Sequence, residues 1–480
     1  MLLCAGLAFA GCVEGPLDDN QNIEQGGNEN GNENGNENES YATLVLDKVT
    51  GTTATFTGHV DVPTSDLSST QVTIYYSDAA TFNINAAEIV STTSFDSEQN
   101  FTITLAGLKF DTKYNYCMVL EVKSKNTYDE VKEFTTLPLV RDLDMYSAVN
   151  LCINSNGEIV LANCYIVSQP GLYSFYHNSL TSKVASCEVL WETFGTSTAP
   201  YKGELIDGIC YDDMIAFQTS DSFKEGNAVI AVKNASGKIL WSWHIWFTDQ
   251  PKDQVYYNNA GTMMDRNLGA TSTTPGDVGA LGLLYQWGRK DPFLGAANID
   301  EDVLAKSTAT WPTFVESNYS TGTYKYADEN PMTFIIGNPN NRDWLYSESV
   351  GYATNRYTYW QTKDGEKGQY DPCPAGYRVP SGGTDGIWST ALGSYDSIYI
   401  DDLYDYTNAG VNFSGLLGPD QTIWSPGSGH RGGSDHYLYN VGKQGTFWSV
   451  LGRLKFNNYV NPYRGDDWGI ANSVRCQKIE

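Results

Sequence analysis

The sequence predicts a multidomain, mainly β protein, and three observations support this fold class. The chain has 480 residues, enough for about three domains at a typical ~100–200 residues each. Aromatic residues make up 13% of the chain and it contains 46 glycines, whereas charged residues make up only 18%. This composition favours strands and turns over charged helices. Short alternating apolar runs, separated by turn residues, recur through the first half of the chain.

The net charge narrows the possible partners. Acidic residues outnumber Lys and Arg by 57 to 30, which gives a formal net charge of -27 at pH 7. Such a surface repels a phosphate backbone, so we expect no nucleic-acid partner. The charge also keeps a surface protein soluble, and an acidic exterior rich in Tyr and Trp is compatible with neutral glycans or with bound Ca²⁺.

Residues 1–12, MLLCAGLAFAGC, form a short apolar run that ends in small residues and Cys12. The run is too short to cross a bilayer and predicts an export signal peptide. Its Ala10-Gly11-Cys12 ending resembles the lipobox of bacterial lipoproteins. The resemblance implies that Cys12 is acylated, with palmitate as an attached chain, and anchors a surface-exposed protein in the outer membrane. A plain secretory signal is the alternative. No Lys or Arg precedes the run, which suggests a true start upstream of Met1.

Residues 13–40 are polar, rich in Gly, Asn and Glu, and have almost nothing apolar to bury. They predict a flexible tether. A spacer of this kind between a lipid site and the first folded region would let the folded part clear the membrane surface.

Residues 41–138 predict a β-sandwich, because several short alternating runs follow one another at close spacing. Within LKFDTKYNY, the residues Leu108, Thr112 and Tyr114 resemble the tyrosine corner of fibronectin type III domains, with Phe110 in place of the usual Pro. The resemblance implies that the Tyr114 hydroxyl bonds to nearby backbone. Cys117 lies on the same predicted strand, and we expect it to be a buried hydrophobe.

Residues 141–249 predict a β-rich middle domain, whose clearest feature is a hairpin of AVIAV and ILWSWHIWF joined by KNASGK. Period-two alternation makes both faces of the second strand largely apolar. We therefore expect a central strand buried on both sides, with an exposed aromatic platform as the alternative. His244 on this strand is then a core histidine with satisfied hydrogen bonds.

Residues 255–480 are rich in Gly, Asn, Tyr, Trp and Pro and contain long irregular segments, which are usually functional or held by disulfides. The runs GTMMDRNLGATS, GLLYQWGRKDPF, DPCPAGYRVPS, WSPGSGHRGG and TFWSV resemble, in this order, the major paralogous domain of Fibrobacter succinogenes. That domain recurs in surface lipoproteins and in fimbrial, tip-like proteins of Bacteroides and its relatives. The resemblance implies a loop-rich α+β fold that is C-type-lectin-like and related to the formylglycine-generating enzyme.

Export would place the chain in an oxidising compartment, where disulfides persist. Cys373 and Cys476 are the only cysteines of the last region and enclose about a hundred residues, so we expect them to form a disulfide worth ~4–5 kcal/mol in the entropy model. The middle region contains four cysteines, which allow two bridges in three connectivities, or none: Cys152, Cys164, Cys187 and Cys210. A buried charge network is also expected around five residues of the last region: Asp265, Arg266, Asn267, Arg378 and Arg475.

The sequence offers no catalytic set. It contains only five histidines, no H-E-x-x-H spacing and no G-x-S-x-G elbow. The G-x-G-x-x-G match in GSGHRG lacks the strand–turn–helix unit of a dinucleotide site, so we expect no dinucleotide there. The resemblance to the major paralogous domain implies that these glycines form a tight loop. The reactive cysteine pair of the formylglycine-generating relatives does not carry over if Cys373 and Cys476 are bridged. We expect no enzyme activity, no metal and no cofactor. Ca²⁺ is compatible with the composition, but no sugar-binding lectin motif supports it.

Aromatic faces and planar donors suit sugars and protein loops, and on that basis we predict five ligand-binding residues: Trp424, His430, Arg431, Tyr437 and Trp468. The order of the regions predicts a non-enzymatic adhesin or fimbrial, tip-like surface lipoprotein, with an extracellular glycan or protein or fimbrial subunits as partner. The first alternative is a glycan-binding lipoprotein of a polysaccharide-uptake system. The second is a secreted hydrolase with accessory domains.

Overall fold

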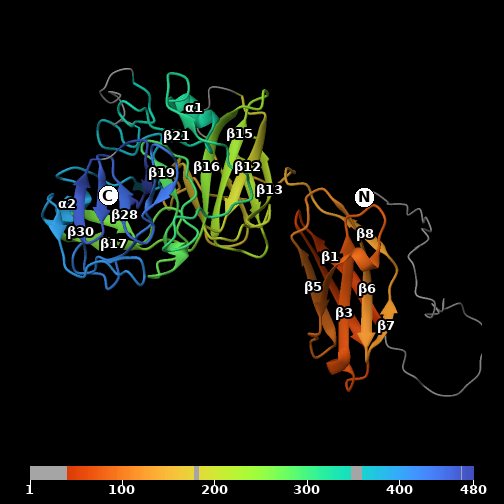
Figure 1. Ribbon diagram of the computed structural model, residues 1–480. Helices are drawn as coiled ribbons and strands as arrows, with labels where there is room; N and C mark the ends of the chain where they lie inside the picture. Colours follow the sequence, from red (N-terminus) through yellow and green to blue (C-terminus); the bar gives the residue numbers. More distant parts are fainter. Residues whose placement is uncertain (1–40, 178–182, 348–358, 466) are drawn as a thin grey trace, which may run out of the picture. The chain divides into compact units, whose positions relative to one another are not determined.

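The computed structural model describes residues 41–177, 183–347, 359–465 and 467–480 (Figure 1). It confirms a multidomain, mainly β protein. The chain divides into two compact units, Met1–Leu139 and Val140–Glu480. The predicted signal sequence with Cys12 and the predicted tether lie outside the described residues. Each α-helix in the described ranges has only six residues, and none of their helices could traverse a bilayer.

The first unit is a sandwich of two antiparallel sheets. Three strands form one sheet in the order β1-β2-β5, and the other has the order β4-β3-β6-β7 with β8 also paired to β6. The alternating apolar residues of both sheets meet in one core that includes Phe56, Ile74 and Phe134. The strands are β1 Tyr41–Val49, β2 Thr53–Asp61, β3 Thr70–Ser77, β4 Glu88–Thr92, β5 Asn100–Ala106, β6 Lys113–Val122, β7 Lys125–Tyr128 and β8 Lys132–Thr135.

The expected tyrosine corner is present at the start of β6. The Lys109 backbone N–H donates to the Tyr114 hydroxyl oxygen over 2.9 Å, which fixes the turn before β6 to the strand itself. Cys117, three residues further on, is a buried free thiol, as predicted. Burial raises the pKa of this thiol, so it behaves as a small apolar side chain.

The second unit begins with two four-stranded sheets, β10-β16-β15-β12 and β13-β14-β11-β9. The predicted hairpin is confirmed, because β15 pairs antiparallel with β16, and these strands run beside β12 in Figure 1. Strand β16 lies between two others and is buried along most of its length, so it is a central strand. The strands are β9 Val149–Asn150, β10 Cys164–Val167, β11 Leu172–Phe175, β12 Ser186–Thr193, β13 Ile206–Tyr211, β14 Ile215–Thr219, β15 Gly226–Lys233 and β16 Ile239–Phe247.

The remainder of the unit is built from short strands and long loops, as the composition predicts. A four-stranded sheet has the order β17-β18-β32-β22, and a larger one has the order β23-β30-β29-β28-β31-β26-β27 with β19 paired to β31. The pairs β20-β21 and β24-β25 stand apart. The elements are β17 Asp253–Tyr256, β18 Gly261–Met264, β19 Leu284–Gln286, β20 Val315–Glu316, α1 Tyr324–Glu329, β21 Ile335–Ile336, β22 Tyr377–Arg378, α2 Ile387–Leu392, β23 Ile398–Tyr399, β24 Gly410–Asn412, β25 Trp424–Pro426, β26 His430–Arg431, β27 Leu438–Tyr439, β28 Gly445–Trp448, β29 Arg453–Phe456, β30 Tyr459–Arg464, β31 Ala471–Ser473 and β32 Gln477–Lys478. Short 3₁₀ helices span Leu67–Ser69, Ile84–Ala86, Tyr257–Asn259 and Val278–Ala280.

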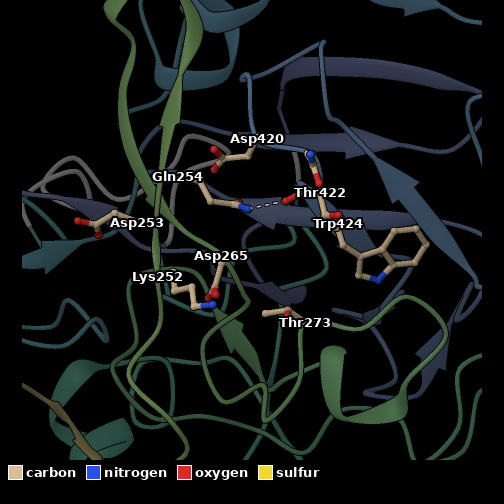
Figure 2. A pocket seen from close by; sticks show the side chains of 9 residues that line it. Lys252, Asp253, Gln254, Asp265, Thr273, Asp420, Thr422 and Trp424 are labelled. Atoms are coloured by element: carbon tan, nitrogen blue, oxygen red, sulfur yellow. Dashed lines mark hydrogen bonds between the residues drawn. The ribbon is translucent and has the colours of Figure 1, made fainter.

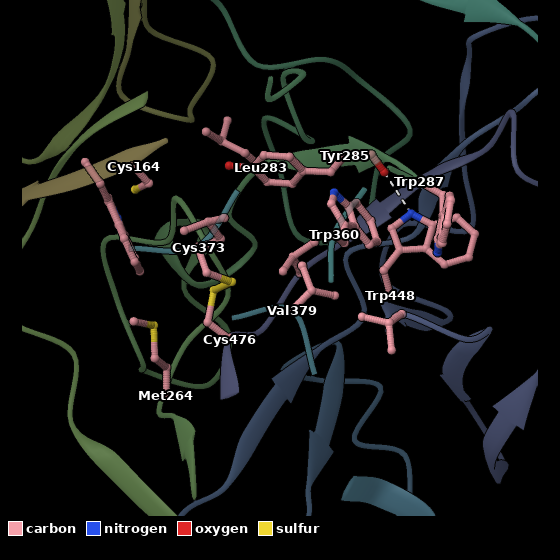
Figure 3. Close-up of a cluster of buried hydrophobic side chains, with 14 of the residues drawn as sticks. Cys164, Met264, Leu283, Tyr285, Trp287, Trp360, Cys373, Val379, Trp448 and Cys476 are labelled. Carbon is pink, nitrogen blue, oxygen red and sulfur yellow. Dashed lines mark hydrogen bonds between the residues drawn. A yellow bond between two sulfur atoms is a disulfide. The ribbon is translucent and has the colours of Figure 1, made fainter. Parts of the chain in front are cut away.

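The predicted middle domain, 141–249, and the predicted last domain, 255–480, pack together in this one compact unit. They share a core that contains Trp191 and Trp246 from the first stretch and Trp287, Trp360 and Trp448 from the second. Figure 3 shows Cys164 of the first stretch in the same cluster as the three tryptophans of the second. Both faces of β16 are apolar, and the loops that follow it in sequence supply part of its cover. The predicted boundary near residue 250 is therefore a short connection between β16 and β17 within one unit.

A disulfide joins Cys373 to Cys476, as predicted, with the two Cα atoms 6.0 Å apart and a sequence separation of 103. It lies inside the shared core (Figure 3). The sequence leaves open whether the four cysteines of the middle region form two bridges or none. The structure has none, because all four are buried free thiols: Cys152, Cys164, Cys187 and Cys210.

Replacing both Cys373 and Cys476 by Ser should lower the free energy of unfolding of the second unit by about 4–5 kcal/mol, because the unfolded chain regains the freedom of a loop of about a hundred residues. All 12 tryptophans lie between residues 191 and 468, so urea unfolding followed by tryptophan fluorescence reports this unit alone. Cys117→Ser in the first unit is the control and should leave that transition in place. An unchanged midpoint in the double variant would contradict the assigned role of the bridge.

Candidate functional site: a polar cleft in the second unit

A cleft of about 430 Å³ opens in the second unit, and we call it the polar cleft (Figure 2). Its wall is formed by nine residues from three parts of the sequence: Lys252, Asp253, Gln254, Asp265, Thr273, Asp420, Gln421, Thr422 and Trp424. Carboxylates, amides and hydroxyls predominate among them. The cleft therefore presents many hydrogen-bonding groups.

Two short strands and one loop position these side chains. Strand β17 carries Asp253 and Gln254 and pairs with β18, where Asp253 is opposite Met264, so Asp265 follows at the same end of the ribbon. The segment 420–424 comes from the loop that leads into β25. The Gln254 side chain crosses to that loop, where its Nε2 donates to the Thr422 carbonyl oxygen over 2.7 Å (Figure 2).

The charges of the cleft are largely compensated. Asp253 accepts hydrogen bonds from the Tyr377 hydroxyl, at 2.7 Å, and from the Lys478 ammonium. Burial alone would raise the pKa of Asp253, but these two donors hold it below its ordinary value. Asp265 accepts from the Arg266 guanidinium, with Nε and Oδ1 2.9 Å apart. Each of these two carboxylates therefore lies beside a cation.

Gln254 has an unused acceptor. Its side chain is 6% exposed, and its Oε1 accepts no hydrogen bond from any residue that the structure describes. The partner of the other amide atom is a carbonyl oxygen, so that atom must be the nitrogen and the orientation of the amide is determined. A buried acceptor without a donor costs about 1–3 kcal/mol, and a ligand with a hydroxyl or N–H group would remove that cost.

Two buried arginines hold residues that line the cleft. Arg475 is 1% exposed. Its Nη2 donates to the Trp424 carbonyl oxygen over 2.8 Å and to Asn267 Oδ1 over 3.2 Å. Arg266 bridges Asp265 and Asp249. The expected charge network is therefore present around four of its five residues, whereas Arg378 donates to the Gly365 carbonyl elsewhere in the unit.

The five predicted ligand residues do not share one surface. Trp424 borders the polar cleft at 4% exposure, and Figure 2 shows its indole directed away from Gln254 and Asp420, so it closes the wall. Trp468 packs edge-on against Trp287, with ring centroids 4.5 Å apart, in the shared core.

The other three predicted residues lie on or beside the β26–β27 hairpin. Arg431 is buried, with its guanidinium over the rings of Phe293 and Phe334 at 5.5 and 4.9 Å. His430 is partly buried, and burial lowers its pKa to about 4. Only Tyr437, at 62% exposure, presents its ring to solvent.

A second group of side chains has the spacing of a nucleophilic site but is sealed in the core. Cys164 Sγ lies 3.4 Å from His244 Nδ1, and His244 Nε2 lies 2.8 Å from Asn227 Oδ1. All three residues are at most 2% exposed. Burial raises the pKa of the Cys164 thiol and lowers the pKa of His244 to about 3, so the pair is neutral and no thiolate forms. His244 is a core histidine with its hydrogen bonds satisfied, as predicted.

The described residues give little support to a metal site or to a dinucleotide site. They contain no group of three or more His, Cys, Asp or Glu side chains that could hold a metal ion. The G-x-G-x-x-G match at residues 427–432 begins in the connection between β25 and β26 and opens no helix, which agrees with the loop that the family resemblance implies.

Comparisons with known proteins supply no family. No family model matches the chain, and no curated protein matches it. Among solved structures, the short and long forms of the sensor domain of the anti-sigma factor RsgI4 from Pseudobacteroides cellulosolvens are 20% and 19% identical, with TM-scores of 0.18 and 0.16. Each similarity covers 22% of this chain, and 99% and 96% of those chains. The solution structure of the same domain is 20% identical, covers 21% and 77%, and has a TM-score of 0.17. At these TM-scores the similarity supports no inference.

Because His244 is buried as the neutral imidazole, it makes the free energy of unfolding of the second unit depend on pH. Its pKa falls from 6.5 to about 3 on folding, so between these values the unfolded chain binds a proton that the folded chain does not, and stability falls as the pH falls. Between pH 7 and pH 5 the loss from this residue should be about 2 kcal/mol. Comparing His244→Gln with the parent at both pH values isolates this contribution, because all other titrating groups are shared. An equal pH dependence in the two proteins would refute the assignment.

Proposed function

We propose that the chain is an exported, lipid-anchored and non-enzymatic surface protein of adhesin or fimbrial, tip-like type. In this proposal Cys12 is the lipid site and residues 13–40 are the tether. The first unit is a fibronectin type III-like spacer, and the second unit is the ligand-binding head, with its last part related to the major paralogous domain. The protein is surface-exposed on the outer membrane.

The observation that carries the proposal is the disulfide between Cys373 and Cys476. A bridge in a chain with an export-type N-terminus is typical of an oxidising compartment outside the cytoplasm. The sealed Cys164 group supports a binding role over a hydrolytic one, because a nucleophile needs access and a thiolate or an activated hydroxyl.

The polar cleft supports a second candidate function, the capture of glycans. A concave site rich in hydroxyl-compatible groups would also suit a glycan-capturing lipoprotein of a polysaccharide-uptake system. The two candidates agree on export, anchoring and the absence of catalysis, and they differ in whether the protein associates with fimbrial subunits.

Lipid attachment at Cys12 is tested by metabolic labelling with a radioactive or clickable fatty acid. We expect the parent protein to be labelled and Cys12→Ala to lose the label, because the thiol is the acylation site. Cys117→Ala is the matched control, since this thiol is buried in the first unit, and it should retain the label. Equal labelling of the parent and Cys12→Ala would remove the lipoprotein claim.

Association with fimbriae is tested by cross-linking proteins at the surface of the bacterium that makes this chain and then affinity-purifying the chain with its cross-linked partners. Fimbrial subunits should be recovered with the parent, and their recovery should fall with Cys12→Ala because the protein no longer reaches the surface in anchored form. Saturable glycan binding without any recovered subunit would favour the uptake candidate over the adhesin.

A further inference from the structure

We propose that the polar cleft binds a neutral saccharide unit directly, without a bridging metal ion. The inference rests on the proposed function, in which the second unit is the ligand-binding head, and it adds the chemical class of the ligand and the place where the ligand lies. It is carried by the charge balance of the cleft, by the orphan acceptor on Gln254 and by the rigidity of the walls.

The charge balance excludes strongly charged ligands. Asp253 is neutralised by Lys478 and Asp265 by Arg266, which leaves Asp420 and Lys252 as one negative and one positive lining charge. A cation would find Asp253 and Asp265 already paired, with only the Asp420 carboxylate left to it, and an anion would lie beside that same carboxylate. A neutral ligand meets neither cost.

The hydrogen-bonding groups of the cleft require a ligand that can both donate and accept. Gln254 Oε1, the free lone pairs of Asp253 and Asp265, and the Asp420 carboxylate accept. Lys252, Gln421 and Thr273 can donate. A sugar hydroxyl does both, and adjacent hydroxyls on one ring can serve several wall groups at once. An apolar ligand would leave the buried Gln254 acceptor unsatisfied.

The size and stiffness of the cleft suit such a ligand. A volume of about 430 Å³ falls within the ~300–1,000 Å³ usual for small-molecule sites. Gln254 joins β17 to the 420–424 loop, and Arg475 holds the Trp424 carbonyl from the other side. These bonds already exist without a ligand, so little ordering entropy remains to be lost on binding.

The test is a glycan array probed with the purified full chain at physiological salt, with and without EDTA. The array carries neutral oligosaccharides ending in glucose, galactose or mannose, and sialylated and sulfated glycans. We expect saturable binding to neutral glycans that EDTA leaves unchanged. The absence of neutral hits, a restriction to anionic glycans, or loss of binding in EDTA would each overturn the inference.

The strongest neutral hit is then titrated calorimetrically against variants. Gln254→Met keeps the length of the side chain and removes both polar atoms, so the Kd should rise at least tenfold. Gln169→Ala, an exposed glutamine outside the cleft, is the matched control and should bind within twofold of the parent. Since Gln254 also holds Thr422, circular dichroism must show that the variant folds.

If Gln254→Met fails to fold, Asp420→Asn replaces it, because Asp420 is only partly buried and keeps its shape. Its Kd should rise at least threefold, and parent-like binding by this variant would overturn the placement of the ligand. Failure on the array together with intact fatty-acid labelling at Cys12 would remove only the ligand class. Loss of labelling with glycan binding retained would instead remove the proposed function.

Discussion

The second unit depends on the fixed position of its C-terminal segment, which the disulfide at Cys476 and the buried guanidinium of Arg475 establish together. The bridge ties this segment to Cys373, 103 residues earlier. The neighbouring Arg475 then contacts Asn267 and the Trp424 carbonyl. Burying a guanidinium is tolerated only while its hydrogen bonds are kept. Movement of any one of these segments would therefore leave the buried Arg475 without a partner and destabilise the unit.

The tryptophan core extends the same constraint to the strands at the start of the unit. Trp246 on β16 donates to the Ala270 carbonyl, Trp448 to the Tyr285 carbonyl and Trp344 to the Trp287 carbonyl. Each indole therefore packs its large apolar surface and also satisfies a loop carbonyl that would otherwise be buried without a donor. In this way the indoles connect long loops to the strands beneath them, and residues 141–249 share one core with the loops that cover them.

The sequence predicts the features that local pattern or simple counting controls. Period-two alternation predicts the first sandwich and the central strand β16, and the two isolated cysteines of the last region predict their own bridge. Tyr114 is recognisable because its corner is a local motif. The polar cleft is different, because Gln254 and Thr422 are 168 residues apart in sequence and neither belongs to a motif. Only tertiary contact makes them neighbours.

The predicted ligand residues fail to converge for a related physical reason. Large aromatic and guanidinium side chains bind ligands well, but the same properties let them bind one another, and in this unit Arg431 lies over Phe293 and Phe334 while Trp468 packs on Trp287. Cys164, His244 and Asn227 have the spacing of a nucleophilic site, but they are buried. Burial keeps both the thiol and the imidazole neutral, so this spacing does not make a reactive site. Residue type and geometry therefore indicate a site only together with access to solvent. In this unit the exposed polar residues of the cleft, among them Asp253 and Gln421, meet that condition, whereas Arg431, Trp468, Cys164 and His244 do not.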